Sequence, residues 1–115
     1  ITPQELLDII NKSKRSFYPG EKHEYSNVNY CLLGMVIEKV TGKTYQAYLQ
    51  EAIFAPAGMT NTGVERLLNI PANRAVGYRM IHGKFRRVQN VVSYAFGSGD
   101  IYATAMDLYH WGNAL

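Results

Sequence analysis

The serine and cysteine side chains are the first candidates for nucleophilic chemistry in this 115-residue sequence. A serine hydroxyl is a weak nucleophile until a neighbouring base accepts its proton. Ser98 partly matches the Gly-x-Ser-x-Gly elbow that joins a strand to a helix, but Phe96 stands where the first glycine is needed. Cys31 is the only cysteine, and it lies in an apolar helical pattern where a small buried side chain is its usual role. Neither residue is therefore predicted to be a nucleophile.

Histidine and cysteine spacing does not indicate a metal centre. His23, His82 and His110 are far apart, and one cysteine can form neither a thiolate cluster nor an intrachain disulfide. No glycine motif of the phosphate-binding or dinucleotide-binding type occurs. We expect no metal and no cofactor.

Tyr25 and Asn27 lie two residues apart, directly before a helical pattern. In an extended loop that enters a helix, both side chains can point to one side. A tyrosine, with an ordinary pKa of about 10, can transfer protons only if nearby cations stabilise its phenolate. The alternative is structural, with Tyr25 packed in the core and Asn27 as the N-cap of the helix. Taken alone, these residues favour the structural alternative.

Helical patterns dominate the chain. Thr2 and Glu5 form a capping box around Pro3 at the start of the first helix, and Pro19-Gly20 marks a turn. A second helix begins close to Asn27 and ends at Gly42. Its apolar residues at spacings of three and four predict one buried stripe: Tyr30, Leu33, Val36, Ile37 and Val40.

The second half of the chain adds two helices and a hairpin. Thr44 caps a third helix that ends by Pro56 and Gly58, and residues 60–77 form a long loop. Residues 77–88 predict a β-hairpin around His82-Gly83. Thr104, with Asp107 three residues later, caps a last helix that still runs at Leu115. The predicted fold class is mainly α with a short β-hairpin, in one helical subdomain spanning residues 1–115.

Composition excludes several classes of protein. Apolar residues make up 47% and charged residues 18%, which is typical of a folded chain. The net charge is +3, and the short clusters at residues 12–15 and 86–87 are interpreted as solvated surface, so no nucleic-acid partner is expected. No apolar run approaches the roughly 20 residues that span a bilayer.

Two segments of the sequence resemble the middle of the serine β-lactamase and penicillin-binding-protein superfamily. The resemblance is to the branch with class C β-lactamases, D-Ala-D-Ala carboxypeptidases and related esterases. The first comprises Phe17-Tyr18-Pro19-Gly20-Glu21, Tyr25-Ser26-Asn27-Val28-Asn29-Tyr30, Leu32-Leu33-Gly34 and Ile37-Glu38-Lys39-Val40-Thr41-Gly42. The second comprises Gly97-Ser98-Gly99-Asp100-Ile101-Tyr102-Ala103-Thr104-Ala105-Met106-Asp107-Leu108, Trp111 and Ala114-Leu115. Pro56-Ala57-Gly58-Met59-Thr60-Asn61-Thr62 resembles a loop of the same family.

The resemblance implies an acyl-serine mechanism built from three elements. A Ser-x-x-Lys helix supplies the nucleophile, a Tyr-x-Asn element supplies a proton-transfer tyrosine and an orienting amide, and a Lys/His-x-Gly strand lines the other wall. It thereby assigns Tyr25 to proton transfer and Asn27 to substrate contact. The substrates it implies are D-alanyl peptides, β-lactams or esters, and the bacterial cell envelope is the expected location.

The chain departs from this pattern at the nucleophile. No serine has a lysine three positions later, and His110-Trp111-Gly112 falls in a predicted helix where the family needs a strand. We therefore expect an internal fragment of a larger catalytic domain, inactive alone, whose uncovered apolar surface at Tyr30, Phe54 and Trp111 promotes homo-association. The alternative function is a non-catalytic helical module that binds peptidoglycan-like peptides or a protein partner.

Overall fold

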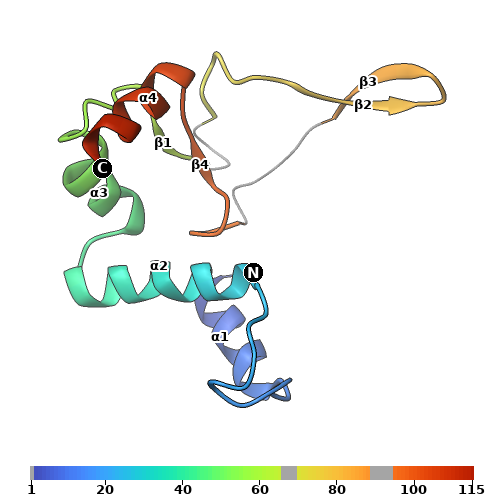
Figure 1. Ribbon diagram of the computed structural model, residues 1–115, viewed down its shortest axis with the longest axis vertical. Coiled ribbons are helices and arrows are strands. Elements are labelled where there is room, and N and C mark those ends of the chain that lie inside the picture. Colours follow the sequence, from blue (N-terminus) through green and yellow to red (C-terminus); the bar gives the residue numbers. More distant parts are fainter. Residues whose placement is uncertain (1, 66–69, 89–94) are drawn as a thin grey trace.

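The computed structural model describes residues 2–65, 70–88 and 95–115. Within them, helices occupy the two ends of the chain and short antiparallel strands the middle (Figure 1). The elements in order are α1 (Pro3–Lys12), α2 (Asn27–Thr41), α3 (Tyr45–Leu49), the π-helical turn η1 (Gln50–Phe54), β1 (Gly63–Val64), β2 (Gly77–Ile81), β3 (Lys84–Val88), β4 (Ile101–Tyr102) and α4 (Ala105–Ala114). The mainly helical class is confirmed for these residues.

The predicted starts of α1, α3 and α4 are formed by local side-chain caps. The Glu5 amide donates to Thr2 Oγ1 at 3.2 Å, and the Thr2 amide donates to Glu5 Oε2 at 2.7 Å, so the capping box is present. At the starts of α3 and α4 only the forward bond is present: the Ala47 amide donates to Thr44 Oγ1 at 3.2 Å, and the Asp107 amide donates to Thr104 Oγ1 at 3.1 Å. These hydrogen bonds satisfy amides that have no partner inside the helix.

Helix α2 has the predicted length but not the predicted buried face. It ends at Gly42, whose φ of 68° gives the left-handed C-cap conformation that other residues adopt only at an energetic cost. The prediction of a buried stripe is wrong in this structure, because Tyr30, Leu33, Val36 and Val40 are exposed and only Ile37 is half-buried. The buried positions are Cys31 and Gly34, because α2 turns this narrower face toward the rest of the chain.

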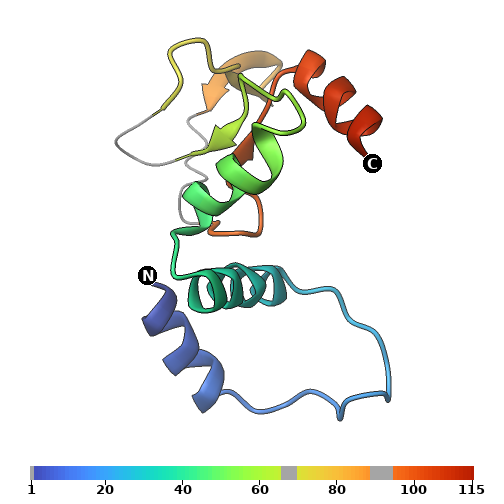
Figure 2. The same ribbon diagram turned by 90° about the vertical axis from the view of Figure 1, so that its left-hand side faces the viewer.

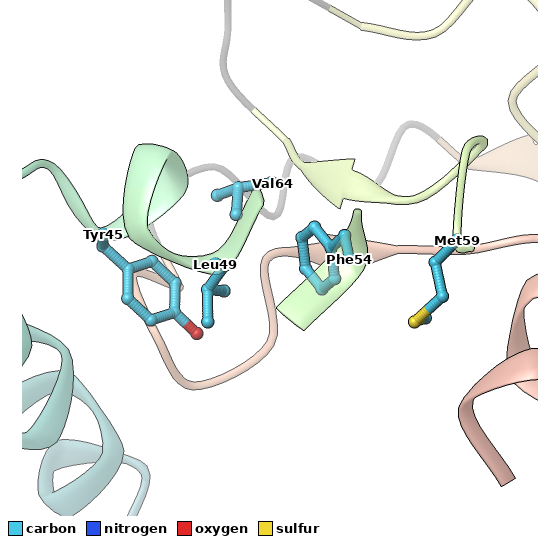
Figure 3. Close-up of a cluster of buried hydrophobic side chains, with 5 residues drawn as sticks. All are labelled: Tyr45, Leu49, Phe54, Met59 and Val64. Atoms are coloured by element: carbon cyan, nitrogen blue, oxygen red, sulfur yellow. The ribbon is translucent and has the colours of Figure 1, made fainter. Parts of the chain in front are cut away.

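The core lies where α3, η1 and β1 meet (Figure 3). Its five buried side chains are Tyr45, Leu49, Phe54, Met59 and Val64. The expectation that Phe54 would be an open apolar residue is wrong, since only 4% of it is exposed. Phe54 is the last residue of η1, where the Ala55 amide donates to the Gln50 carbonyl at 3.0 Å. The chain then turns at Gly58, which has φ of 70°, and the Met59 amide donates to the Phe54 carbonyl at 2.8 Å. Met59 thereby joins Phe54 in the core.

Two small sheets are present in the described residues. The predicted hairpin is confirmed as β2 paired with β3, and His82 and Gly83 both have positive φ at its turn. The pairing of β1 with β4 was not predicted, because residues 60–77 were interpreted as loop. It places the Gly63–Val64 segment beside β4, the strand that leads into α4, in the upper part of the view in Figure 2.

Helix α4 is fastened to the loop that precedes β1. Both the Asn61 amide and the Thr62 hydroxyl donate to Asp107 Oδ2 at 2.7 Å. The hydrogen bond from Thr62 lowers the pKa of Asp107 below its ordinary value, against the opposing effect of burial. Asp107 therefore joins segments 45 residues apart instead of closing the capping box that its position suggested. None of the helices in the described residues is long and apolar enough to cross a membrane.

Candidate active site

Tyr25 and Asn27 meet at the start of α2. Ser26 between them is the N-cap, and its extended backbone, with φ of −146° and ψ of 126°, turns its two neighbours toward the same side. The Tyr25 hydroxyl donates to Asn27 Oδ1 at 3.0 Å. The sequence argument that both side chains can point to one side is therefore confirmed.

Both structural alternatives for this pair are wrong. Tyr25 is 65% exposed, so it is not a core residue. Asn27 is the first residue of α2 and not its cap, and Ser26 makes no side-chain capping bond. With its Oδ1 engaged by the phenol, the Asn27 amide nitrogen is the group left to donate toward a ligand. The pair thus presents a phenol oxygen and an amide donor on open surface.

Tyr30 lies one turn further along α2 and supports the Tyr25 ring. The two ring centroids are 5.6 Å apart with a tilt of 43°, within the range for favourable aromatic pairs. Sequence analysis placed Tyr30 in a buried stripe and did not foresee this contact. The spacing between Tyr25 and Tyr30 did not predict this contact, because Tyr25 precedes α2 and helical periodicity relates only residues within a helix.

The second motif segment packs against the same helix. Gly97 has φ of 69°, and a Cβ built on it would lie 2.8 Å from the Tyr30 carbonyl oxygen. A Cβ on Gly34 would lie 2.9 Å from the Phe96 ring. Two glycines therefore permit the 96–97 backbone to approach α2 one turn beyond Asn27. The two segments that carry the family resemblance are in direct contact.

Internal hydrogen bonds fix the shape of the 95–100 turn. The Ser98 hydroxyl donates to the Ala95 carbonyl at 2.9 Å, and the Gly97 amide donates to Asp100 Oδ1 at 3.1 Å. Asp100 is fully buried, and burial together with this carboxylate raises the pKa of Tyr45. Ser98 is thus occupied by the turn, in agreement with its rejection as a nucleophile.

The other residues considered as candidates, His110, Cys31 and His23, have different surroundings from Tyr25 and Asn27. His110 is on α4, as predicted for a helix and not a strand, and its Nδ1 lies 3.1 Å from the Gly58 carbonyl oxygen. Cys31 is buried and free. His23 is exposed. The described ranges contain no group of three or more His, Cys, Asp or Glu side chains arranged to hold a metal.

The sequence analysis did not predict the ion pair between Glu65 and Arg74. Glu65 is 2% exposed, and its Oε2 lies 3.0 Å from Nε of the half-buried Arg74, both within residues 60–77, which were predicted as a long loop. The Glu65 amide also donates to the Asp100 carbonyl at 2.7 Å, which extends the β1–β4 pairing. The nine-residue spacing of the two charges has no local geometry that a sequence pattern could reveal.

Comparison with protein families matches residues 2–115 to the family described as Beta-lactamase. A Bacillus subtilis protein named as a penicillin-binding protein is 35% identical over all of this chain and 29% of its own length. An Escherichia coli K12 protein named as a D-alanyl-D-alanine carboxypeptidase is 41% identical over 56% of this chain and 15% of its own length. The chain thus spans less than a third of these two curated relatives.

Two solved structures also superpose on nearly the whole chain. The D-amino acid amidase of Ochrobactrum anthropi, complexed with L-phenylalanine, superposes with a TM-score of 0.81 at 34% identity. That match covers 99% of this chain and 34% of the amidase. A penicillin-binding protein of Bacillus halodurans superposes with a TM-score of 0.78 at 29% identity, over 97% of this chain and 35% of that protein.

Proposed function

Because the chain belongs to the β-lactamase family, we propose that it forms the Tyr-x-Asn wall of a serine acyl-hydrolase active site. The substrates would be D-amino-acid peptides or amides, β-lactams or simple esters, cleaved through an acyl-serine. The observation that carries the proposal is the 3.0 Å hydrogen bond between Tyr25 Oη and Asn27 Oδ1 on exposed surface. Relatives named for D-alanyl-D-alanine carboxypeptidase and D-amino acid amidase activity support this substrate class.

In the proposed mechanism, Tyr25 accepts the proton of a serine hydroxyl as that oxygen attacks the acyl carbonyl. It then passes the proton to the leaving amine or alcohol. The Asn27 amide nitrogen donates to the substrate and holds the scissile group in place. The serine, and the lysine that lowers the pKa of the phenol, would come from a Ser-x-x-Lys helix, because no such motif occurs in these 115 residues.

The same proposal places the chain as the helical part of a larger catalytic domain with a mixed α/β part beside it. The relatives are bacterial proteins named as penicillin-binding proteins and carboxypeptidases, so we place the activity in the cell envelope. The chain alone would not form an acyl-enzyme, since neither Tyr25 nor Asn27 replaces the serine.

Kinetics on the natural full-length protein test the assignment. We expect Tyr25→Phe to slow acylation by about 10²-fold or more, the usual contribution of a positioned proton-transfer group. Tyr109→Phe, on the exposed face of α4, is the matched control and should leave the rate unchanged. Asn27→Ala should slow different acyl donors to different extents, because it acts through substrate position.

Mass spectrometry after incubation with a β-lactam is a second test of the proposed acyl-serine mechanism. The full-length protein should gain the mass of one whole β-lactam, because the amine released by ring opening stays attached to the acyl group. The 115-residue chain should gain none. An unchanged acylation rate in Tyr25→Phe, or covalent labelling of the chain alone, would contradict the proposal. Tight binding of peptidoglycan peptides without any turnover would favour a non-catalytic binding module instead.

A further inference from the structure

The β2–β3 hairpin holds the excess positive charge of the chain. Residues 77–88 include Arg79, Lys84, Arg86 and Arg87 and no Asp or Glu, so their formal charge is +4. The whole chain has a net charge of +3, which leaves −1 for all other residues together. In Figure 1 this hairpin projects away from the helices, and every residue in it is exposed except the half-buried Val88.

Strand register sorts the hairpin side chains onto two faces. Cross-strand partners share a face, and successive residues alternate between faces. Tyr78 pairs with Arg87 and Met80 with Phe85, so one face is mainly apolar. The opposite face carries the pairs Arg79–Arg86 and Ile81–Lys84. The hairpin is therefore amphipathic, with three cations gathered on one side.

This arrangement is unfavourable in water on both faces. Arg79 lies directly opposite Arg86, and like charges in that position destabilise a strand pair. Within the described parts of the chain, no acidic side chain forms an ion pair with any hairpin cation. On the other face, Phe85 is 72% exposed and Tyr78 62% exposed. An anionic partner with an apolar layer would relieve both features.

We propose that the β2–β3 hairpin docks peripherally on a bilayer that contains anionic phospholipids. A soluble polyanion would neutralise the cations but leave Tyr78, Met80 and Phe85 in water. At a membrane interface, aromatic side chains sit at headgroup level and an inserted apolar face reaches roughly 5–10 Å below the surface. At that depth the phosphates lie beside and above a two-stranded ribbon, within reach of long arginine and lysine side chains.

Vesicle co-sedimentation of the 115-residue chain tests the charge requirement. Binding should be strong to vesicles of phosphatidylglycerol and phosphatidylcholine and weak to phosphatidylcholine alone. Each cation near an anionic surface contributes about fivefold, so R79Q/K84Q/R86Q should weaken binding on the order of a hundredfold. The control K12Q/K14Q/R15Q removes the same charge from another exposed cluster and should change binding little. An equal loss in both triple variants would overturn the proposal, because net charge alone would then explain binding.

The apolar face is tested separately with Phe85→Ser. This exposed substitution should weaken vesicle binding and leave binding to dextran sulfate unchanged. A local reporter is available because Cys31 is the only cysteine: in Cys31→Ser/His82→Cys, an environment-sensitive fluorophore at the hairpin turn should shift to the blue on anionic vesicles. Circular dichroism of each variant verifies folding. No blue shift, or vesicle binding that is indifferent to Phe85→Ser, would make the hairpin a polyanion site and refute membrane docking.

Discussion

Substitution of Gly97 tests whether the two motif segments are held together as the structure indicates. A Cβ on this residue would lie 2.8 Å from the Tyr30 carbonyl oxygen and 3.7 Å from the Gly34 Cα. The first neighbour is backbone inside α2, so it cannot rotate away as a side chain would. Gly97→Ala must therefore shift the turn or the start of the helix, in addition to adopting a positive φ of 69°.

Gly42→Ala separates these two costs. Gly42 has nearly the same φ, 68°, but a Cβ there would meet nothing within 4 Å. The left-handed conformation costs alanine about 1–2 kcal/mol, of which about 0.4–1 kcal/mol is offset by the less flexible unfolded chain. Overpacking against a rigid neighbour adds about 1–3 kcal/mol. We expect Gly42→Ala to destabilise by about 1 kcal/mol and Gly97→Ala by about 2–4 kcal/mol.

Urea unfolding followed by far-ultraviolet circular dichroism measures the difference. With a urea dependence of about 2 kcal/mol per molar, an added 2 kcal/mol moves the midpoint by about 1 M. Equal midpoints for the two alanine variants would refute the close contact between the 95–100 turn and α2. A change in the urea dependence itself would instead indicate an altered unfolded or partly folded state.

Three further substitutions, one of them with a control variant, probe separate parts of the molecule. Phe54→Ala should destabilise the chain by about 3–5 kcal/mol in urea unfolding because it empties a core position, whereas Tyr109→Ala on exposed surface should cost far less. Asp107 has a lowered pKa when folded, so its charge stabilises above the ordinary value of 3.8 and that benefit disappears as pH falls through the folded pKa. Thermal melts should therefore show Asp107→Asn less stable than the natural chain at pH 7 and nearly equal to it in strong acid. Under the proposed function, Ser98→Ala should retain acylation in the full-length protein, since the Ser98 hydroxyl donates to the Ala95 carbonyl within the 95–100 turn.

Local features of this fold were predictable because their causes lie within a few residues. Thr2 with Glu5, and Thr104 with the amide of Asp107, are caps formed across three residues. His82-Gly83 specifies the hairpin turn through positive φ at adjacent positions. Such contacts depend little on the rest of the chain, so the sequence pattern was a sufficient guide.

Features that need distant partners were not predictable in the same way. The β1–β4 pairing joins Gly63 to Tyr102 through strands of two residues each, too short to show alternation. Phe54 is buried in a cluster with residues of α3 and β1, and helical periodicity around Phe54 does not show that these segments come together. The stripe beginning at Tyr30 has the spacing of a buried face, but periodicity only predicts that residues share a face and not that something covers it.

The candidate site combines both kinds of information. The two-residue spacing predicted that Tyr25 and Asn27 would share a side, and the extended Ser26 backbone brings their polar ends to 3.0 Å. Their position depends on the first turns of α2, where Tyr30 makes two contacts. Its ring packs against the Tyr25 ring, and its carbonyl oxygen lies against Gly97. A change at Gly97 would therefore reach the phenol through Tyr30 without touching it. Under the proposed mechanism, Gly97→Ala in the full-length protein should slow acylation while leaving the phenol in place, whereas Tyr25→Phe removes it.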